Sequence, residues 1–125
     1  IKFVVVPTPS DVVIDCRSAQ ITQVLLNLVN NAADAVETLA VKWIRVEVKT
    51  YDSEVRFLVT DSGTGIPAEV RKNLFVPFFT TKPVGKGTGL GLSIAHSVIK
   101  QHEGDIHVNE ESKNTEFVIC LKRAG

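Results

Sequence analysis

Hydrophobic residues follow a helical spacing in two long stretches of the chain. Within residues 17–39 the spacing is that of one apolar face of an α-helix. The residues on this face are Ile21, Val24, Leu25, Leu28, Ala32, Ala35, Val36 and Leu39. A second long helix is predicted for residues 90–102, closed by Gly104.

Runs of β-branched or alternating residues predict strands around these helices. The first runs cover residues 2–6 and 12–14, with two prolines between them. Residues 44–49 and 55–59 alternate apolar with polar side chains, as two paired antiparallel strands do. Residues 106–108 and 115–121 predict a final hairpin.

Residues 61–88 form a loop-rich segment with one helical turn or two over residues 68–73. Irregular segments of this length in compact domains are usually functional. Because the predicted strands and helices do not alternate strictly, the expected fold is an α/β two-layer sandwich. Its mixed, mostly antiparallel sheet would pack against about three helices.

Length and composition fit a single domain that spans residues 1–125. An apolar content of 44% is enough for one core. Because 14 basic residues balance 14 acidic ones, no overall positive field favours nucleic acid or an anionic membrane. The chain resembles a domain excised from a longer protein. Its two widely spaced cysteines suit a cytoplasmic setting.

The first predicted helix carries a second, polar face. At 100° per residue, Gln23, Asn27, Asn30, Asn31 and Asp34 fall in one sector away from the apolar face. Asn is a poor helix former, so its repetition here calls for a reason. Carboxamide oxygens suit Mg²⁺, and Asn27 and Asn31 at i and i+4 can reach one ion. The residues alone leave open a solvated face and a metal or phosphate site.

Glycine-rich loops lie at both ends of the loop-rich segment. Residues 61–66 read Asp-Ser-Gly-Thr-Gly-Ile after a predicted strand, which by itself fits a simple turn. Residues 85–92 read Gly-Lys-Gly-Thr-Gly-Leu-Gly-Leu before a predicted helix. There, backbone N–H groups and the positive helix end favour a phosphate. This second loop is neither a P-loop nor a dinucleotide-binding fingerprint.

The order of four motifs resembles the ATP-binding catalytic domain of sensor histidine kinases. This branch belongs to the GHKL ATPase superfamily, which includes DNA gyrase, heat-shock chaperones and mismatch-repair proteins and has the Bergerat fold. Residues 23–35 are similar to the N box, 61–66 to the G1 box, 75–82 to the F box and 87–92 to the G2 box. The Phe-Phe-Thr-Thr-Lys run resembles the nitrogen-regulatory subgroup. The resemblance implies that ATP lies between the N-box helix and a lid over residues 80–88.

The same resemblance implies a role for each matching residue. Asn31 would coordinate Mg²⁺ and Asn27 would assist at the phosphates, so Asn27, Asn31 and Lys82 are the expected catalytic residues. Asp61 would accept a hydrogen bond from the adenine amino group, supported by Thr115, because an acceptor-only group selects adenine over guanine. The residues expected to contact Mg-ATP are Asn27, Asn31, Asp34, Asp61, Gly63, Gly65, Ile66, Phe79, Thr81, Lys82, Gly87, Thr88, Gly89, Leu90, Gly91, Leu92 and Thr115.

Asn27 distinguishes the branches of the superfamily. The gyrase-like and chaperone ATPases carry a glutamate there as general base, and an amide cannot take that proton. The resemblance therefore implies transfer of the γ-phosphoryl group to a histidine on a separate dimerisation domain of the same kinase. His96, His102 and His107 are interpreted as surface or structural residues. The isolated domain is expected to bind nucleotide with little turnover.

Two other functions stay open at this point. One is a motor-like ATPase module of the same superfamily, and the other is a nucleotide-sensing module or a serine kinase of the anti-sigma type. For the kinase, the implied partners are the dimerisation domain and, indirectly, a response regulator in two-component signal transduction. No nucleic acid and no direct membrane contact are expected. The domain would be a monomer and the parent kinase a homodimer.

Overall fold

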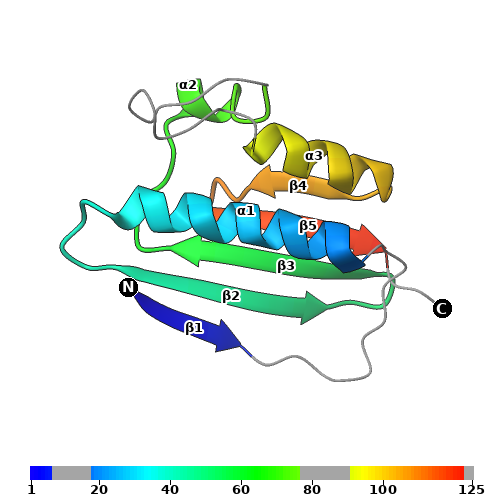
Figure 1. Cartoon of the computed structure of the whole chain (residues 1–125), viewed down its shortest axis with the longest axis horizontal. Coiled ribbons are helices and arrows are strands. Elements are labelled where there is room, and N and C mark those ends of the chain that lie inside the picture. The colour runs from blue at the N-terminus through cyan, green and yellow to red at the C-terminus, as the bar shows by residue number, and fades with distance from the viewer. Residues whose placement is uncertain (7–17, 77–90, 123–125) are drawn as a thin grey trace.

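The computed structural model describes residues 1–6, 18–76 and 91–122. They form the elements β1 (Lys2–Val6), α1 (Ser18–Val36), β2 (Trp43–Thr50), β3 (Glu54–Asp61), α2 (Ala68–Arg71), α3 (Gly91–Gln101), β4 (Asp105–Val108) and β5 (Glu116–Lys122). Figure 1 shows α1 and α3 together on one face of the sheet, which confirms the predicted α/β two-layer sandwich. None of the helices in these residues is long and apolar enough to span a bilayer.

The strands form one sheet in the order β1-β2-β3-β5-β4. β1 pairs with β2 in parallel, and the pairs β2–β3, β3–β5 and β4–β5 are antiparallel. This is the mixed, mostly antiparallel sheet that the strand pattern predicted. β3 and β5 are neighbours although β4 and two helices separate them in sequence, so the end of β3 lies beside the start of β5.

The core lies between the sheet and the two long helices. On α1 it takes Ile21, Val24, Leu28 and Ala32, each at most 5% exposed. On the sheet and α3 it takes Ile44, Val59, Ala95, Ile99, Phe117 and Ile119, among others. The helical apolar face predicted for residues 17–39 is therefore the face that packs against the sheet.

The bounds of three predicted elements differ from the structure. α1 ends at Val36 rather than at Leu39, because the backbone N–H groups of Glu37 and Leu39 bond to carbonyls three residues back. Such bonds tighten a final turn and stop the helix. β2 and β3 extend beyond their predicted bounds, to Trp43–Thr50 and Glu54–Asp61. The strand predicted for residues 12–14 lies outside the described residues.

Alternation along β3 and β5 gives the sheet two different faces. Val59 and Phe117, a cross-strand pair, lie in the core under the helices. The next pair, Thr60 and Glu116, therefore faces the opposite side of the sheet, which neither α1 nor α3 covers (Figure 1). Asp61 returns to the helix face, in register with the buried Ile44 of β2.

The end of α3 corrects one expectation about Gly104. The left-handed residue that closes the helix is Glu103, with φ 58°. The N–H groups of Glu103 and Gly104 bond to the carbonyls of Lys100 and Ile99, at 3.0 and 2.9 Å, which is a Schellman motif. Gly104 is needed for space instead, because a Cβ there would lie 2.5 Å from the carbonyl oxygen of Cys120.

We therefore expect Gly104→Ala to destabilise the domain by about 1–3 kcal/mol, as overpacking against a backbone does. Urea unfolding followed by circular dichroism measures this change. Gly91→Ala is the matched control, because no atom of residues 1–6, 18–76 or 91–122 lies within 4 Å of a Cβ at that position. Equal stability of the Gly104→Ala variant and the parent would show that β5 yields at no cost.

Candidate functional site

The end of β3 and the start of β5 bring together two polar residues that are far apart in sequence. Asp61 is the last residue of β3, and Thr115 directly precedes β5. The N–H of Asp61 donates to the carbonyl of Thr115 at 2.9 Å, and the N–H of Thr115 donates to the carbonyl of Gly63 at 3.2 Å. Both residues are buried, with exposed fractions of 3% and 7%. The sheet thus fixes the pair that was predicted to recognise adenine.

Residues 61–66, here called the G1 turn, fold closely around these two side chains. The N–H of Gly63 donates to Asp61 Oδ1 at 2.7 Å, and the N–H of Gly65 donates to Thr115 Oγ1 at 3.0 Å. A Cβ on Gly63 would lie 2.7 Å from Asp61 Oδ1 and 3.1 Å from Thr115 Oγ1. Gly65 has φ 102°, a conformation that side chains disfavour. The two glycines are therefore required for different reasons.

Burial raises the pKa of the Asp61 carboxyl, and the hydrogen bond from the Gly63 N–H offsets part of the shift. A raised pKa means that ionised Asp61 disfavours folding. The stability that Asp61 contributes is present at acidic pH, below its unfolded-state pKa, and is lost as pH rises through the folded-state pKa. A buried carboxylate with capacity for another hydrogen bond is a strong acceptor for a ligand N–H group.

Asn27 connects α1 to the start of α3. Its Nδ2 donates to the carbonyl of Gly91 at 3.3 Å, and its Oδ1 accepts from Gln23 Nε2 at 3.1 Å. Each amide atom can still make one more hydrogen bond. Gly91 is the first residue of α3, and no atom of the described residues occupies the space where its side chain would lie. A ligand could therefore approach the helix N-terminus beside Asn27.

Asn31 and Asp34 belong to the C-terminal half of α1. Figure 1 shows that α1 runs toward the end of the sheet where β3 ends and β5 begins. Asn31 is half-buried and Asp34 is exposed. Among the described residues, none forms a hydrogen bond to the Asn31 side chain. One half-exposed carboxamide oxygen fits a single ligand to Mg²⁺, which keeps several waters. No cluster of three or more His, Cys, Asp or Glu in the described part of the chain could hold a metal instead.

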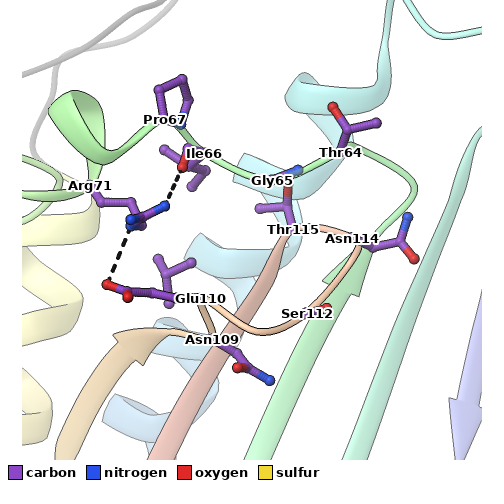
Figure 2. Close-up of a pocket in the computed structure, with 11 residues that line it drawn as sticks. Thr64, Gly65, Ile66, Pro67, Arg71, Asn109, Glu110, Ser112, Asn114 and Thr115 are labelled. Carbon is purple, nitrogen blue, oxygen red and sulfur yellow. Dashed lines mark hydrogen bonds and ion pairs between the residues drawn. The ribbon is translucent and has the colours of Figure 1, made fainter.

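A cavity of about 360 Å³ lies between the G1 turn and the loop that connects β4 to β5. The predicted residues Gly65, Ile66 and Thr115 line it, whereas Asp61 does not. Figure 2 shows Arg71 at one side, where its Nη1 donates to the carbonyl of Ile66 at 2.7 Å and its Nε lies 3.5 Å from Glu110. The cavity therefore adjoins the pair Asp61 and Thr115 rather than enclosing it.

Sequence analysis missed Arg71 and Asn114. Arg71 ties the G1 turn to the loop that connects β4 to β5, and Asn114 Nδ2 donates to the Gly63 carbonyl at 3.1 Å. Neither residue stands in a motif, and the contacts of Arg71 with Glu110 and of Asn114 with Gly63 join segments that are far apart in sequence. The only available signal for Asn114 was its position next to Thr115.

Of the remaining predicted residues, two pack against the core and seven lie outside the described residues. Ile66 and Leu92 are half-buried and pack against the core from the G1 turn and from α3. Seven predicted residues lie outside the described part of the chain, namely Phe79, Thr81, Lys82, Gly87, Thr88, Gly89 and Leu90. Their roles stay predictions.

Residues 16–125 match the family described as histidine kinase-, DNA gyrase B-, and HSP90-like ATPase. The chain belongs to this family. The relatives that it resembles include the sensor kinase CckA of Brucella abortus (strain 2308), 43% identical over 83% of this chain and 12% of that protein. The sensor histidine kinase ZraS of Escherichia coli (strain K12) is 43% identical over 82% of this chain and 21% of its own length. The chain thus spans a small part of either relative.

The fold agrees with these relatives. A nucleotide-free catalytic domain of the histidine kinase ThkA superposes with a TM-score of 0.83 and 34% identity, covering 99% of this chain and 81% of that one. The resemblance to sensor histidine kinase ATP-binding domains is therefore confirmed, and nucleotide binding follows from the family. The subgroup, the individual site residues and Mg²⁺ stay predictions.

The raised pKa of Asp61 leads to a prediction about the pH dependence of nucleotide affinity. If the carboxylate accepts a hydrogen bond from adenine, binding favours its ionised form. Affinity for ADP should then fall as pH decreases from neutrality toward the ordinary Asp pKa of 3.8, and the fall should begin above that value. Calorimetric titration of wild type and Asp61→Asn at several pH values measures this. Protonation of the ADP phosphates affects both proteins, so it cancels in their difference. Parallel pH profiles would rule out Asp61 as the acceptor.

Proposed function

We propose that this domain binds Mg-ATP and transfers its γ-phosphoryl group to a histidine on a separate dimerisation domain of the same kinase. The observation that carries the proposal is the junction of Asp61, Gly63 and Thr115, which presents a buried acceptor on the helix side of the sheet. The adenine amino group is the matching donor. Asn27 and the N-terminus of α3 lie on the same side of the sheet and suit the phosphates.

The division of labour among the residues follows from their chemistry. Asp61 and Thr115 would hold the base, Asn27 and Gly91 would face the phosphate tail, and Asn31 would hold Mg²⁺. The ion would offset the negative charge of the phosphates when bound there. Catalysis would consist mainly of positioning, since phosphoryl transfer needs in-line alignment and charge compensation more than covalent help from the enzyme.

The contacts of the three histidines in the described residues support a phosphoryl acceptor outside this chain. His96 stacks on Phe75 with ring centroids 5.1 Å apart. His102 Nδ1 lies 2.8 Å from the carbonyl of Val98, and His107 Nδ1 lies 2.8 Å from Asp105 Oδ2. Each ring thus has a structural partner, which is Phe75 after α2 for His96, Val98 of α3 for His102 and Asp105 of β4 for His107. This supports an acceptor histidine outside the chain.

Two solved relatives support the wider assignment. Full-length ShkA was solved in complex with AMPPNP, and ThkA was solved in complex with the response regulator TrrA. They are 28% and 30% identical to this chain, with TM-scores of 0.75 and 0.79. A response regulator is accordingly the proposed recipient of the phosphoryl group at the next step. We propose a cytoplasmic location for the domain.

We expect Asn31→Ala to weaken the Mg²⁺ dependence of binding. In wild type, affinity for a non-hydrolysable ATP analogue should rise when Mg²⁺ is added, and the variant should lose most of this rise. Micromolar binding corresponds to about 8 kcal/mol, which calorimetry resolves well. Asn30→Ala is the matched control, because Asn30 is exposed on the neighbouring position of α1. Loss of the Mg²⁺ effect in both variants, or in neither, would remove Asn31 from its assigned role.

The reaction itself is tested with γ-labelled ATP and the parent's purified dimerisation domain. We expect acid-labile label on the added domain and none on this chain, with little phosphate released in the absence of the acceptor. Asp61→Asn should lower the initial rate at subsaturating ATP about tenfold or more, because a hydrogen bond to a charged group is lost. Steady phosphate release without an acceptor would favour the motor-like ATPase. Binding without transfer would favour a nucleotide-sensing module.

A further inference from the structure

A buried carboxyl group lies directly behind the proposed base site, on the opposite face of the sheet. Glu116 is 7% exposed, and both of its carboxyl oxygens accept hydrogen bonds. Thr60 Oγ1 donates to Oε2 at 2.8 Å, and Asn109 Nδ2 donates to Oε1 at 3.0 Å. Thr60 itself is 2% exposed. We call these three residues the rear clamp.

The rear clamp joins three strands at the level of the site. Thr60 stands on β3 and Glu116 on β5, as the last cross-strand pair in the β3–β5 register. Asn109 follows β4, and its N–H also donates to the backbone carbonyl of Glu116 at 2.9 Å. The neighbours of this pair along the chain are Asp61 and Thr115, whose side chains point to the other face. A shift or twist of the clamp would therefore displace both base-site residues.

Core packing alone does not explain the rear clamp. Asp61 and Glu116 are the two acidic residues that are buried among those the structure describes. The Glu54 carboxyl group is half-buried and the Asp105 carboxyl group is exposed, and they are paired with Arg56 and Lys100. Burying a carboxyl group is costly unless its oxygens are bonded, and an apolar residue would fill the same space without that cost. Fully bonded polar networks specify one geometry.

We propose that Thr60, Glu116 and Asn109 are positioning residues that hold Asp61 and Thr115 at the spacing required for adenine. The proposal rests on the proposed function, because it assigns the clamp to the selectivity of the same site. None of the three touches the base. They act through the backbone of the residues that do, so their loss should reduce discrimination between bases more than affinity for the phosphates.

The test compares the affinities of each variant for ADP and IDP. Hypoxanthine, the base of IDP, carries a carbonyl oxygen in place of the adenine amino group. This oxygen and the Asp61 carboxylate are both acceptors, so they cannot form a hydrogen bond with each other. Thr60→Val keeps the shape of the side chain and removes the hydroxyl, whereas Thr60→Ser keeps the hydroxyl. Glu116→Gln replaces one carboxyl oxygen by an NH2 group, so the Thr60 hydroxyl can no longer donate to that atom and the bond there must reverse its direction.

We expect wild type to prefer ADP, and Thr60→Val and Glu116→Gln to lower the ratio of the two affinities about three- to tenfold. Thr60→Ser should restore most of the ratio. Glu54→Gln, at the other end of β3, should leave it unchanged. A lower urea midpoint with an unchanged ratio would overturn the proposal, since that is the outcome of a purely structural role.

A second measurement separates this proposal from the proposed function. The amide resonances of Gly63 and Gly65 report their hydrogen bonds to Asp61 and Thr115 without any nucleotide. Thr60→Val should shift both amides, and Thr60→Ser should shift them less. Unchanged amides would overturn the proposal even if ADP binds. If wild type binds neither nucleotide, the proposed function fails, and the amides still decide whether the clamp positions the G1 turn.

Discussion

The junction between the end of β3 and the start of β5 is the interaction on which the rest of the site depends. The backbone bonds between Asp61 and Thr115 and between Thr115 and Gly63 tie the two segments where the ladder stops. Because the sheet supplies this tie, the Asp61 carboxyl stays buried at a fixed place. Its raised pKa is the electrostatic cost of that burial. A ligand that donates a hydrogen bond there lowers the cost, which links base recognition directly to the fold.

The second contact that organises the site is between the two long helices. The bond from Asn27 to the carbonyl of Gly91 joins the middle of α1 to the first residue of α3. In sequence, the G1 and F boxes lie between these two elements, and the G2 box ends in the first two residues of α3. The start of α3 is therefore set by a polar residue of the first helix as well as by its own apolar face, of which Ala95 and Ile99 are fully buried. An apolar residue at position 27 could still pack, but it could not orient this carbonyl.

The sequence was sufficient for features that depend on local pattern. The spacing of Leu28 and its neighbours predicted the buried face of α1, and the alternation in β2 and β3 predicted their pairing. The order of the four boxes led to the family, and Thr115 was assigned to the base site only through that resemblance.

The order of the strands in the sheet, with β5 between β3 and β4, depends on long-range pairing and was not predicted. The contacts of Arg71 with Glu110 and of Asn114 with Gly63 join segments that only the folded sheet brings together, so no local pattern could indicate them. Gly104 shows a different limit, because its need for space arises from a carbonyl of another strand.

The two buried acids of the described chain stand back to back at one level of the sheet. Asp61 faces the helices with bonding capacity to spare, whereas both oxygens of Glu116 are engaged on the far face. Without the clamp, the end of β3 could rotate and turn the Asp61 carboxyl toward water, which would lower the cost of burying it. The clamp opposes such a rotation where it requires the backbone to move, because the peptide before Asp61 cannot turn without breaking the buried bond from Thr60 to Glu116. The rigidity of the far face is thus the physical condition under which an under-bonded acceptor persists on the near one.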